Sequence, residues 1–178
     1  MMQFGHVSVE SRLGPVVVLW GDLSDGPRVY FILLPNEVLP AQFFPKAVSC
    51  APIAELAARL EAYLAGQPVD FDLSLLAWEQ CSEFQRSVLL AQSGIPHGWV
   101  STYARIAAHL RSPRAARSVS MALAYNPFPI VIPCHRTVRS DGSLGGYRGG
   151  LAMKRALLGM EGVAFESENV VRLDKVWY

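Results

Sequence analysis

Residues 126–136 of this 178-residue chain are Asn126-Pro127-Phe128-Pro129-Ile130-Val131-Ile132-Pro133-Cys134-His135-Arg136. The apolar run is bounded by prolines and predicts a buried strand, which delivers a cysteine directly beside a histidine and an arginine. Only the thiolate of a cysteine is a useful nucleophile, and nearby cationic or hydrogen-bonding groups raise its population. The stretch therefore predicts a reactive Cys134 with His135 at its side.

Simpler interpretations of this stretch stay open on the residues alone. A free cysteine such as Cys134 is often a small buried hydrophobic residue without chemistry, and His135 could be a core histidine bonded to a backbone carbonyl. Adjacent cysteine and histidine residues do not have the spacing of zinc ligands. No metal site is therefore expected here.

Upstream of this stretch the sequence predicts helices joined by short turns, over residues 82–92, 101–110 and 112–125. Ser82 can cap the first helix and Ser101 or Thr102 the second, while Ser112 followed by Pro113 is a strong start signal for the third. The last two helices meet across residues 111–112 and predict a helix-turn-helix. Its second helix carries Arg114 and Arg117 near the N-terminus, where DNA-binding proteins place contacts, although tight helix pairs are also common elsewhere.

The first third of the chain predicts a strand meander over residues 4–9, 15–20 and 27–34, separated by turns rich in glycine, proline and aspartate. A helix is expected at about 51–65, because Ile53, Leu56, Leu60 and Leu64 recur at helical spacing and Gly66 follows. Residues 66–80 are expected to be a linker. The fold class is thus α+β, with a small N-terminal α/β domain at 1–78 and a helical C-terminal domain with a winged helix-turn-helix at 79–178.

Composition narrows the class of protein. The chain is 51% hydrophobic and 17% charged, which is typical of a soluble globular protein and not of a disordered one. Its apolar runs are short, so no membrane span is expected, and its first residues lack the features of a secretory signal. The three cysteines are widely spaced and odd in number, which argues against a disulfide framework and favours the cytoplasm.

The net charge of +1 hides an uneven distribution along the chain. Residues 1–96 hold five Lys and Arg against ten Asp and Glu, whereas residues 97–160 hold nine against Asp141 alone. Such a basic segment suits a phosphate backbone, although a solvated helical face is the plainer interpretation. The near absence of acids favours an anionic partner.

The run from Pro133 to Arg136 resembles the active-site motif of the O6-alkylguanine-DNA alkyltransferases, also called methylated-DNA–protein-cysteine methyltransferases. The resemblance extends from about Phe84 to Gly162. It includes, in order, Ile95-Pro96-x-Gly98, Tyr103, Arg117-x-Val119, Asn126-Pro127, Gly145-Gly146-Tyr147-x-Gly149-Gly150-Leu151, Lys154 and Leu157-Leu158-x-x-Glu161-Gly162. The N-terminal third resembles the family only loosely.

The resemblance implies a catalytic group made of Cys134, His135, Glu161, Asn126, Tyr103 and Lys154. Cys134 attacks the alkyl carbon, His135 takes the thiol proton through a water, and Glu161 orients that histidine. Asn126 is implied to stabilise the turn that holds these groups, and Lys154 to belong to the pocket lid. Tyr103 is implied to steer the nucleotide and to bond guanine at N3.

The resemblance also implies a group that contacts DNA or the base: Arg117, Tyr103, Arg136, Tyr147, Arg148, Gly149, Arg114 and Ser120. Arg117 fills the space vacated when the damaged base flips out of the duplex from the minor-groove side. The implied partner is double-stranded DNA carrying O6-alkylguanine, bound by a monomer. The product, an S-alkyl cysteine, has no good leaving group, so each molecule acts once, without metal or organic cofactor.

Two other functions remain as alternatives. One is a winged-helix protein that binds alkylated DNA without chemistry, but such relatives typically have tryptophan where this chain has Cys134. The other is a cysteine hydrolase, in which Arg117 and the basic helix-turn-helix would have no purpose. Ser120 is a departure from the family, whose members often have glycine there.

Overall fold

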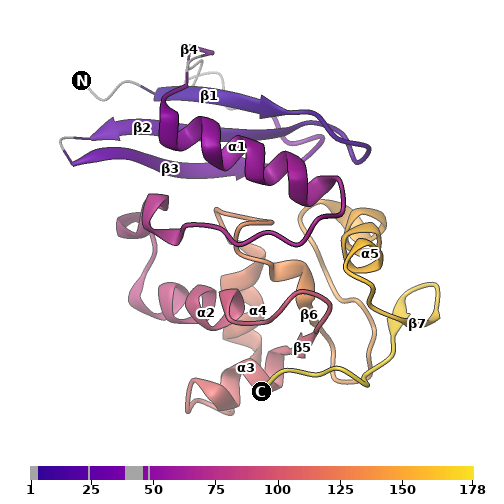
Figure 1. Cartoon of the computed structure of the whole chain (residues 1–178). Helices are drawn as coiled ribbons and strands as arrows, with labels where there is room; N and C mark the ends of the chain where they lie inside the picture. Colours follow the sequence, from indigo (N-terminus) through magenta and orange to yellow (C-terminus); the bar gives the residue numbers. More distant parts are fainter. Residues whose placement is uncertain (1–3, 24, 39–45, 48) are drawn as a thin grey trace. The chain divides into compact units, whose positions relative to one another are not determined.

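The computed structural model describes residues 4–23, 25–38, 46–47 and 49–178 (Figure 1). The chain divides into two compact units, one made of Met1–Gln80 with Pro127–Val131 and the other of Cys81–Asn126 with Ile132–Tyr178. The two-domain organisation with limits at 78 and 79 stays a prediction. The mixed α and β architecture with a strand meander is confirmed by its match to solved structures of similar proteins.

The first unit is built on a four-stranded sheet in the order β3-β2-β1-β4, with β1 and β4 parallel and the other neighbours antiparallel. Its elements are β1 (Phe4–Val9), β2 (Val16–Leu23), β3 (Gly26–Leu33), β4 (Lys46–Ala47) and α1 (Ala51–Leu64). The helix lies across one face of the sheet (Figure 1) and buries Ile53, Leu56 and Leu60. The meander and its helix were predicted, but β2 and β3 run further into the turn than expected, because they stay paired from Gly21 and Arg28 to Leu23 and Gly26.

Residues 66–80 are more ordered than a simple linker. They contain the short 3-10 helices η1 (Leu73–Leu75) and η2 (Trp78–Gln80), and the Ala77 N–H donates to the Val29 carbonyl at 2.9 Å. Leu76 and Ala77 are buried. The segment is therefore part of the first unit, held to the edge of β3 by a backbone bond.

The second unit contains the helices α2 (Glu83–Ser93), α3 (Tyr103–His109), α4 (Ala116–Ala124) and α5 (Gly150–Met160). Two short strand pairs accompany them: β5 (Ser101–Thr102) parallel to β6 (Thr137–Val138), and β7 (Phe165–Ser167) antiparallel to β8 (Val170–Val171). The predicted caps of α2 and α3 are confirmed, since Ser82 accepts from Gln85 N–H and Thr102 from Arg105 N–H, both at 3.2 Å. The pair α3–α4 forms the expected helix-turn-helix.

The predicted start of the third helix is wrong. Helix α4 begins at Ala116, and Ala115 at its N-cap provides no side-chain hydrogen bond. Ser112 instead opens a turn in which its carbonyl accepts from Ala115 N–H at 2.8 Å, and Arg111 before it has φ 55°. Proline suits a turn as well as the first position of a helix, so the local signal did not distinguish the two.

The strand predicted before Cys134 is also wrong. Ile130 has φ 74°, which breaks extended backbone, and no strand is assigned between Asn126 and the 3-10 helix η3 (Cys134–Arg136). The segment is nonetheless buried, as its apolar composition indicated: Phe128, Ile130 and Ile132 are at most 1% exposed. Residues 127–131 belong to the first unit, where the Pro127 carbonyl accepts from Ile32 N–H at 2.8 Å.

Candidate active site

Cys134 opens the short helix η3 and lies at the edge of the buried interior, 9% exposed. Its backbone N–H donates to the Ile132 carbonyl at 2.7 Å, in a tight turn. The Asn126 side chain, 2% exposed, donates to the same carbonyl at 3.1 Å and also hydrogen-bonds with the cysteine side chain. Asn126 therefore holds the turn that leads into Cys134.

His135, Glu161 and Arg136 form one buried ionic network. His135 Nε2 lies 2.9 Å from Glu161 Oε1, at the C-terminal cap of α5. The guanidinium of Arg136 binds the same carboxylate in a bidentate manner, with Nε and Nη2 each donating over 2.8 Å. Bidentate pairs between arginine and a carboxylate are strong and geometrically specific, so the carboxylate cannot rotate away from the histidine.

The loop before β5 completes this network. Arg136 Nη1 donates to the Ile95 carbonyl at 2.6 Å, and the Gly98 N–H donates to Glu161 Oε2 at 3.3 Å. Gly98 has φ 77°, and a Cβ there would lie 2.9 Å from the Glu161 carbonyl oxygen. The Ile95-Pro96-x-Gly98 motif thus supports the carboxylate, and only glycine fits its last position.

The protonation states follow from these contacts. Burial alone would raise the pKa of Glu161, but hydrogen bonds and charge from His135 and Arg136 lower it far below its usual range. Burial lowers the pKa of His135, against the opposing effect of Glu161. At neutral pH the site therefore holds an ionised carboxylate beside a neutral imidazole. An ionised carboxylate only accepts, so Nε2 carries the ring proton and Nδ1 is the basic nitrogen.

Lys154 is fully buried on α5 and serves three carbonyls. Its Nζ donates to Thr137 O at 2.6 Å and to Gly146 O at 3.4 Å, and also to Leu144 O. Burial lowers the pKa of Lys154 to about 8, so the ammonium is still largely charged at neutral pH. It therefore ties β6 to the loop 144–146, and its expected place in a pocket lid stays a prediction.

The thiol of Cys134 is protonated in the free protein at neutral pH. Burial raises its pKa, while hydrogen bonding with Asn126 and the positive charges of Lys154 and Arg148 oppose that rise. A buried thiol of this kind needs a base to become a nucleophile. The neutral imidazole of the neighbouring His135 is suited to that task.

Tyr103 at the start of α3 borders the loop 144–146. Burial and the proximity of Cys134 raise the pKa of its phenol, against the effects of Arg139 and a hydrogen bond with Ser120. Gly145 has φ 66°, and a Cβ there would lie 3.2 Å from the Tyr103 hydroxyl oxygen. A pocket of about 390 Å³ opens at this loop, lined by Arg139, Ser143, Leu144, Gly145, Gly146, Tyr147, Gly150, Leu151 and Asn169.

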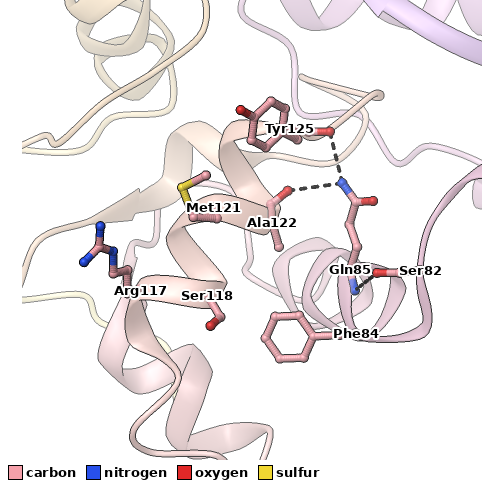
Figure 2. A pocket seen from close by; sticks show the side chains of 8 residues that line it. All are labelled: Ser82, Phe84, Gln85, Arg117, Ser118, Met121, Ala122 and Tyr125. Carbon is pink, nitrogen blue, oxygen red and sulfur yellow. Dashed lines mark hydrogen bonds between the residues drawn. The ribbon is translucent and has the colours of Figure 1, made fainter.

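The structure places the remaining expected residues in two groups. Arg114 is exposed just before α4, and Arg117 is exposed in the first turn of that helix. Figure 2 shows Arg117 projecting from the helix. Tyr147 lines the pocket, and Arg148 is the next residue in the chain. The Tyr147 ring is edge-on to His135 at 6.4 Å, and Arg148 Nη1 donates to the Asn126 carbonyl at 2.8 Å, while Gly149 is the N-cap of α5.

The expected role of Arg136 in DNA contact stays a prediction, and the structure shows this side chain in contacts inside the protein. Its side chain is 11% exposed, and its three nitrogens serve Glu161 and the Ile95 carbonyl. Three of the five N–H donors of this guanidinium are thus used inside the protein. Arg136 is therefore part of the buried ionic network with His135 and Glu161.

Gln92 is a structural member of the site that the sequence did not predict. It is fully buried on α2, where its Nε2 donates to the Pro133 carbonyl and its Oε1 accepts from the Thr137 hydroxyl, both at 2.5 Å. These bonds hold the backbone on both sides of η3. The available signal was a polar residue one turn after Val88 and Leu89 on the apolar face of a helix.

No group of three or more potential metal ligands from His, Cys, Asp and Glu occurs among the described residues. In the same part of the chain, no helix is both long and apolar enough to cross a membrane.

Comparisons with known proteins agree on one family. The model of the "6-O-methylguanine DNA methyltransferase, DNA binding domain" family matches residues 83–163. Similar curated proteins named methylated-DNA–protein-cysteine methyltransferase include one from Methanosarcina barkeri, 46% identical over 86% of this chain and 94% of its own. Another, from Methanothermobacter thermautotrophicus, is 43% identical over 85% and 81%.

Solved structures give the same result for the fold. The crystal structure of Mycobacterium tuberculosis O6-methylguanine methyltransferase has a TM-score of 0.74 and 31% identity, with 90% of this chain and 93% of that chain covered. A structure of the Mycobacterium tuberculosis protein in complex with DNA has a TM-score of 0.73 and 30% identity, over 88% and 92%. The similarity thus covers both units of the chain.

Proposed function

The chain belongs to the methylated-DNA–protein-cysteine methyltransferase family, and we propose that it repairs DNA by moving an alkyl group from O6 of guanine to Cys134. The observation that carries the proposal is the buried Cys134 next to a neutral His135, itself held by the carboxylate of Glu161. The transfer of an alkyl group to a side chain requires a nucleophile, a base and a group that orients the base. Cys134, His135 and Glu161 can provide these three parts.

The reaction balances with the groups present. The thiol proton passes through a water to Nδ1 of His135, whose Nε2 proton is held by Glu161. The Cys134 sulfur then forms a bond to the alkyl carbon as that carbon's bond to O6 breaks, and guanine leaves with the electron pair. The Tyr103 phenol, bordering the pocket, is the proposed donor that offsets charge on the departing base.

The product limits each molecule to one reaction. An S-alkyl cysteine is a thioether, and water cannot displace its sulfur under mild conditions. The chain therefore acts stoichiometrically, and we propose that it does so without a metal or organic cofactor. A reducing compartment keeps such a free thiol active, which favours the cytoplasm.

Intact-mass analysis tests the proposed transfer. After incubation with DNA containing O6-methylguanine, each chain should gain one methyl group, mapped by fragmentation to residue 134. Cys134→Ser should gain none and still bind DNA, because the basic surface is unchanged. Methylation of Cys50 or Cys81, or turnover beyond one methyl per chain, would contradict the assignment.

The proposed partner is double-stranded DNA. A monomer of the protein binds the minor groove of this DNA. Arg117 supports this part of the proposal, because a long planar side chain exposed near the start of α4 can replace a flipped nucleotide in the stack. Flipping costs a few kcal/mol, so Arg117→Ala should slow transfer from duplex DNA far more than transfer from free O6-benzylguanine. Equal slowing of both substrates would show that Arg117 supports the pocket instead.

A further inference from the structure

Gln92 spans the short helix that carries the reactive cysteine. Its side chain comes from α2 and is fully buried. Nε2 donates to the Pro133 carbonyl before η3, and Oε1 accepts from the Thr137 hydroxyl after it, both at 2.5 Å. Burying an amide is costly unless its polar atoms are paired, and an apolar side chain would fill a core position without that cost. The two bonds therefore point to a role beyond packing.

The backbone that Gln92 holds is a tight turn. Pro133 has φ −78° and ψ 61°, and the Cys134 N–H donates to the Ile132 carbonyl at 2.7 Å, which together make an inverse γ-turn. The Asn126 amide donates to the Ile132 carbonyl of this turn. The Gln92 amide donates to the next carbonyl, that of Pro133. Two buried amides from different segments thus hold the carbonyls of the two residues that come before Cys134.

Thr137 is the fixed point to which Gln92 ties this turn. It is fully buried and pairs with Ser101 in the sheet of β5 and β6. Its carbonyl accepts from Lys154 Nζ at 2.6 Å, and its hydroxyl donates to Gln92. A shift of the Pro133 carbonyl would therefore strain the bonds of Gln92, because their other end is a residue that is itself held in place.

We propose that Gln92 and Thr137 act together as positioning residues for the transfer reaction. They fix the direction in which the chain enters Cys134, and so hold its sulfur where His135 and the alkyl carbon can both be reached. Displacement of a reacting group by about 1 Å can slow a reaction about a hundredfold. Both side chains are fully buried, so they act through the turn and not through the substrate. The inference rests on the proposed function, because it concerns the rate of the proposed transfer.

Removing one partner and removing both should affect stability differently. Thr137→Val leaves Gln92 Oε1 buried without its donor, and Gln92→Met leaves the Thr137 hydroxyl without its acceptor, so each single variant should melt below the wild type. Replacing both partners with apolar groups of similar shape removes the unpaired atoms, and the Pro133 carbonyl still accepts from the Arg136 N–H at 2.9 Å. The double variant should therefore recover most of the loss and melt within about 4 °C of the wild type.

The transfer rate should not recover with the stability. Single-turnover transfer from duplex DNA with one O6-methylguanine, at increasing excess of protein, gives the rate constant in the complex and the half-saturating protein concentration. Gln92→Met and the double variant should both lower that rate constant about tenfold or more, because neither connects the turn to Thr137. The half-saturating concentration should stay within about twofold of the wild type. Thr137→Ser keeps the hydroxyl and should transfer at nearly the wild-type rate.

Val88→Ala is the matched control, measured like the other variants below its melting temperature. Val88 is fully buried on α2, one turn before Gln92, so this variant should lose stability and keep the wild-type rate constant. A wild-type rate constant in the double variant would overturn the inference, and so would rates that follow the melting temperatures across all the variants. A raised half-saturating concentration with an unchanged rate constant would also overturn it and assign the pair to DNA binding. Absence of methyl transfer in the wild type would overturn the proposed function instead.

Discussion

The two units of the molecule differ in what they bury. In the described part of the first unit the buried side chains are aliphatic or aromatic, as in Val18, Ile32 and Leu60. The second unit holds Gln92, Ser101, Thr102, Asn126, His135, Arg136, Thr137, Lys154 and Glu161, every buried polar or charged side chain among the described residues. An apolar core stabilises in proportion to the area it buries and tolerates exchange of similar residues, whereas a buried polar network fails when one partner is lost. The difference indicates that the second unit carries the chemistry.

The largest expected effect comes from Glu161→Gln in the polar network. The substitution removes the charge that holds His135 and balances Arg136, so single-turnover transfer should slow about a hundredfold or more. The unfolding free energy should also fall by about 3–5 kcal/mol, because a buried guanidinium loses its carboxylate. Rates are to be measured with free O6-benzylguanine, which requires no base flipping, below the melting temperature of the variant.

Leu60→Ala provides the matched change in the apolar unit. It should lower the unfolding free energy by a similar amount, about 2–5 kcal/mol, and leave the transfer rate of the folded protein unchanged. A strong loss of rate in Leu60→Ala, or a wild-type rate in Glu161→Gln, would break the distinction between the two kinds of core.

The next effect concerns Lys154 and pH. Its pKa in the folded protein is about 8, against 10.5 for an ordinary lysine, so between these values the unfolded chain binds more protons. The unfolding free energy of the wild type should therefore rise relative to Lys154→Met as the pH increases from about 8 to about 10.5, by up to about 3 kcal/mol. Urea unfolding of both proteins across this range measures the difference. A constant difference would mean that Lys154 titrates normally.

The smallest effect is expected from the reaction itself. A methyl group added to Cys134 enters a close-packed site, which costs about 1–3 kcal/mol when the neighbours cannot move aside. Thermal melts before and after reaction with O6-methylguanine DNA should show a lower midpoint for the methylated protein. Equal midpoints would show that the space around the sulfur accommodates a methyl group.

Local signals predicted a large part of the fold. The meander, α1, and the caps of α2 and α3 were predicted, because Ser82 and Thr102 bond to amides only three residues away. The start of α4 was not, because Ser112 and Pro113 suit a turn as well as a helix. The segment before Cys134 was expected to be a strand, since apolar composition reports burial but does not report the positive φ of Ile130.

The sequence by itself determined the chemistry: a cysteine next to a histidine, within motifs whose resemblance to one family also indicated Glu161 and Asn126. Only the tertiary structure decided which partners complete the site. Arg136 meets a carboxylate 25 residues away, and Gln92 meets the Pro133 carbonyl 41 residues away. Neighbours in sequence restrict a residue's local conformation, but a hydrogen bond between distant segments depends on how the helices pack, which no local pattern records.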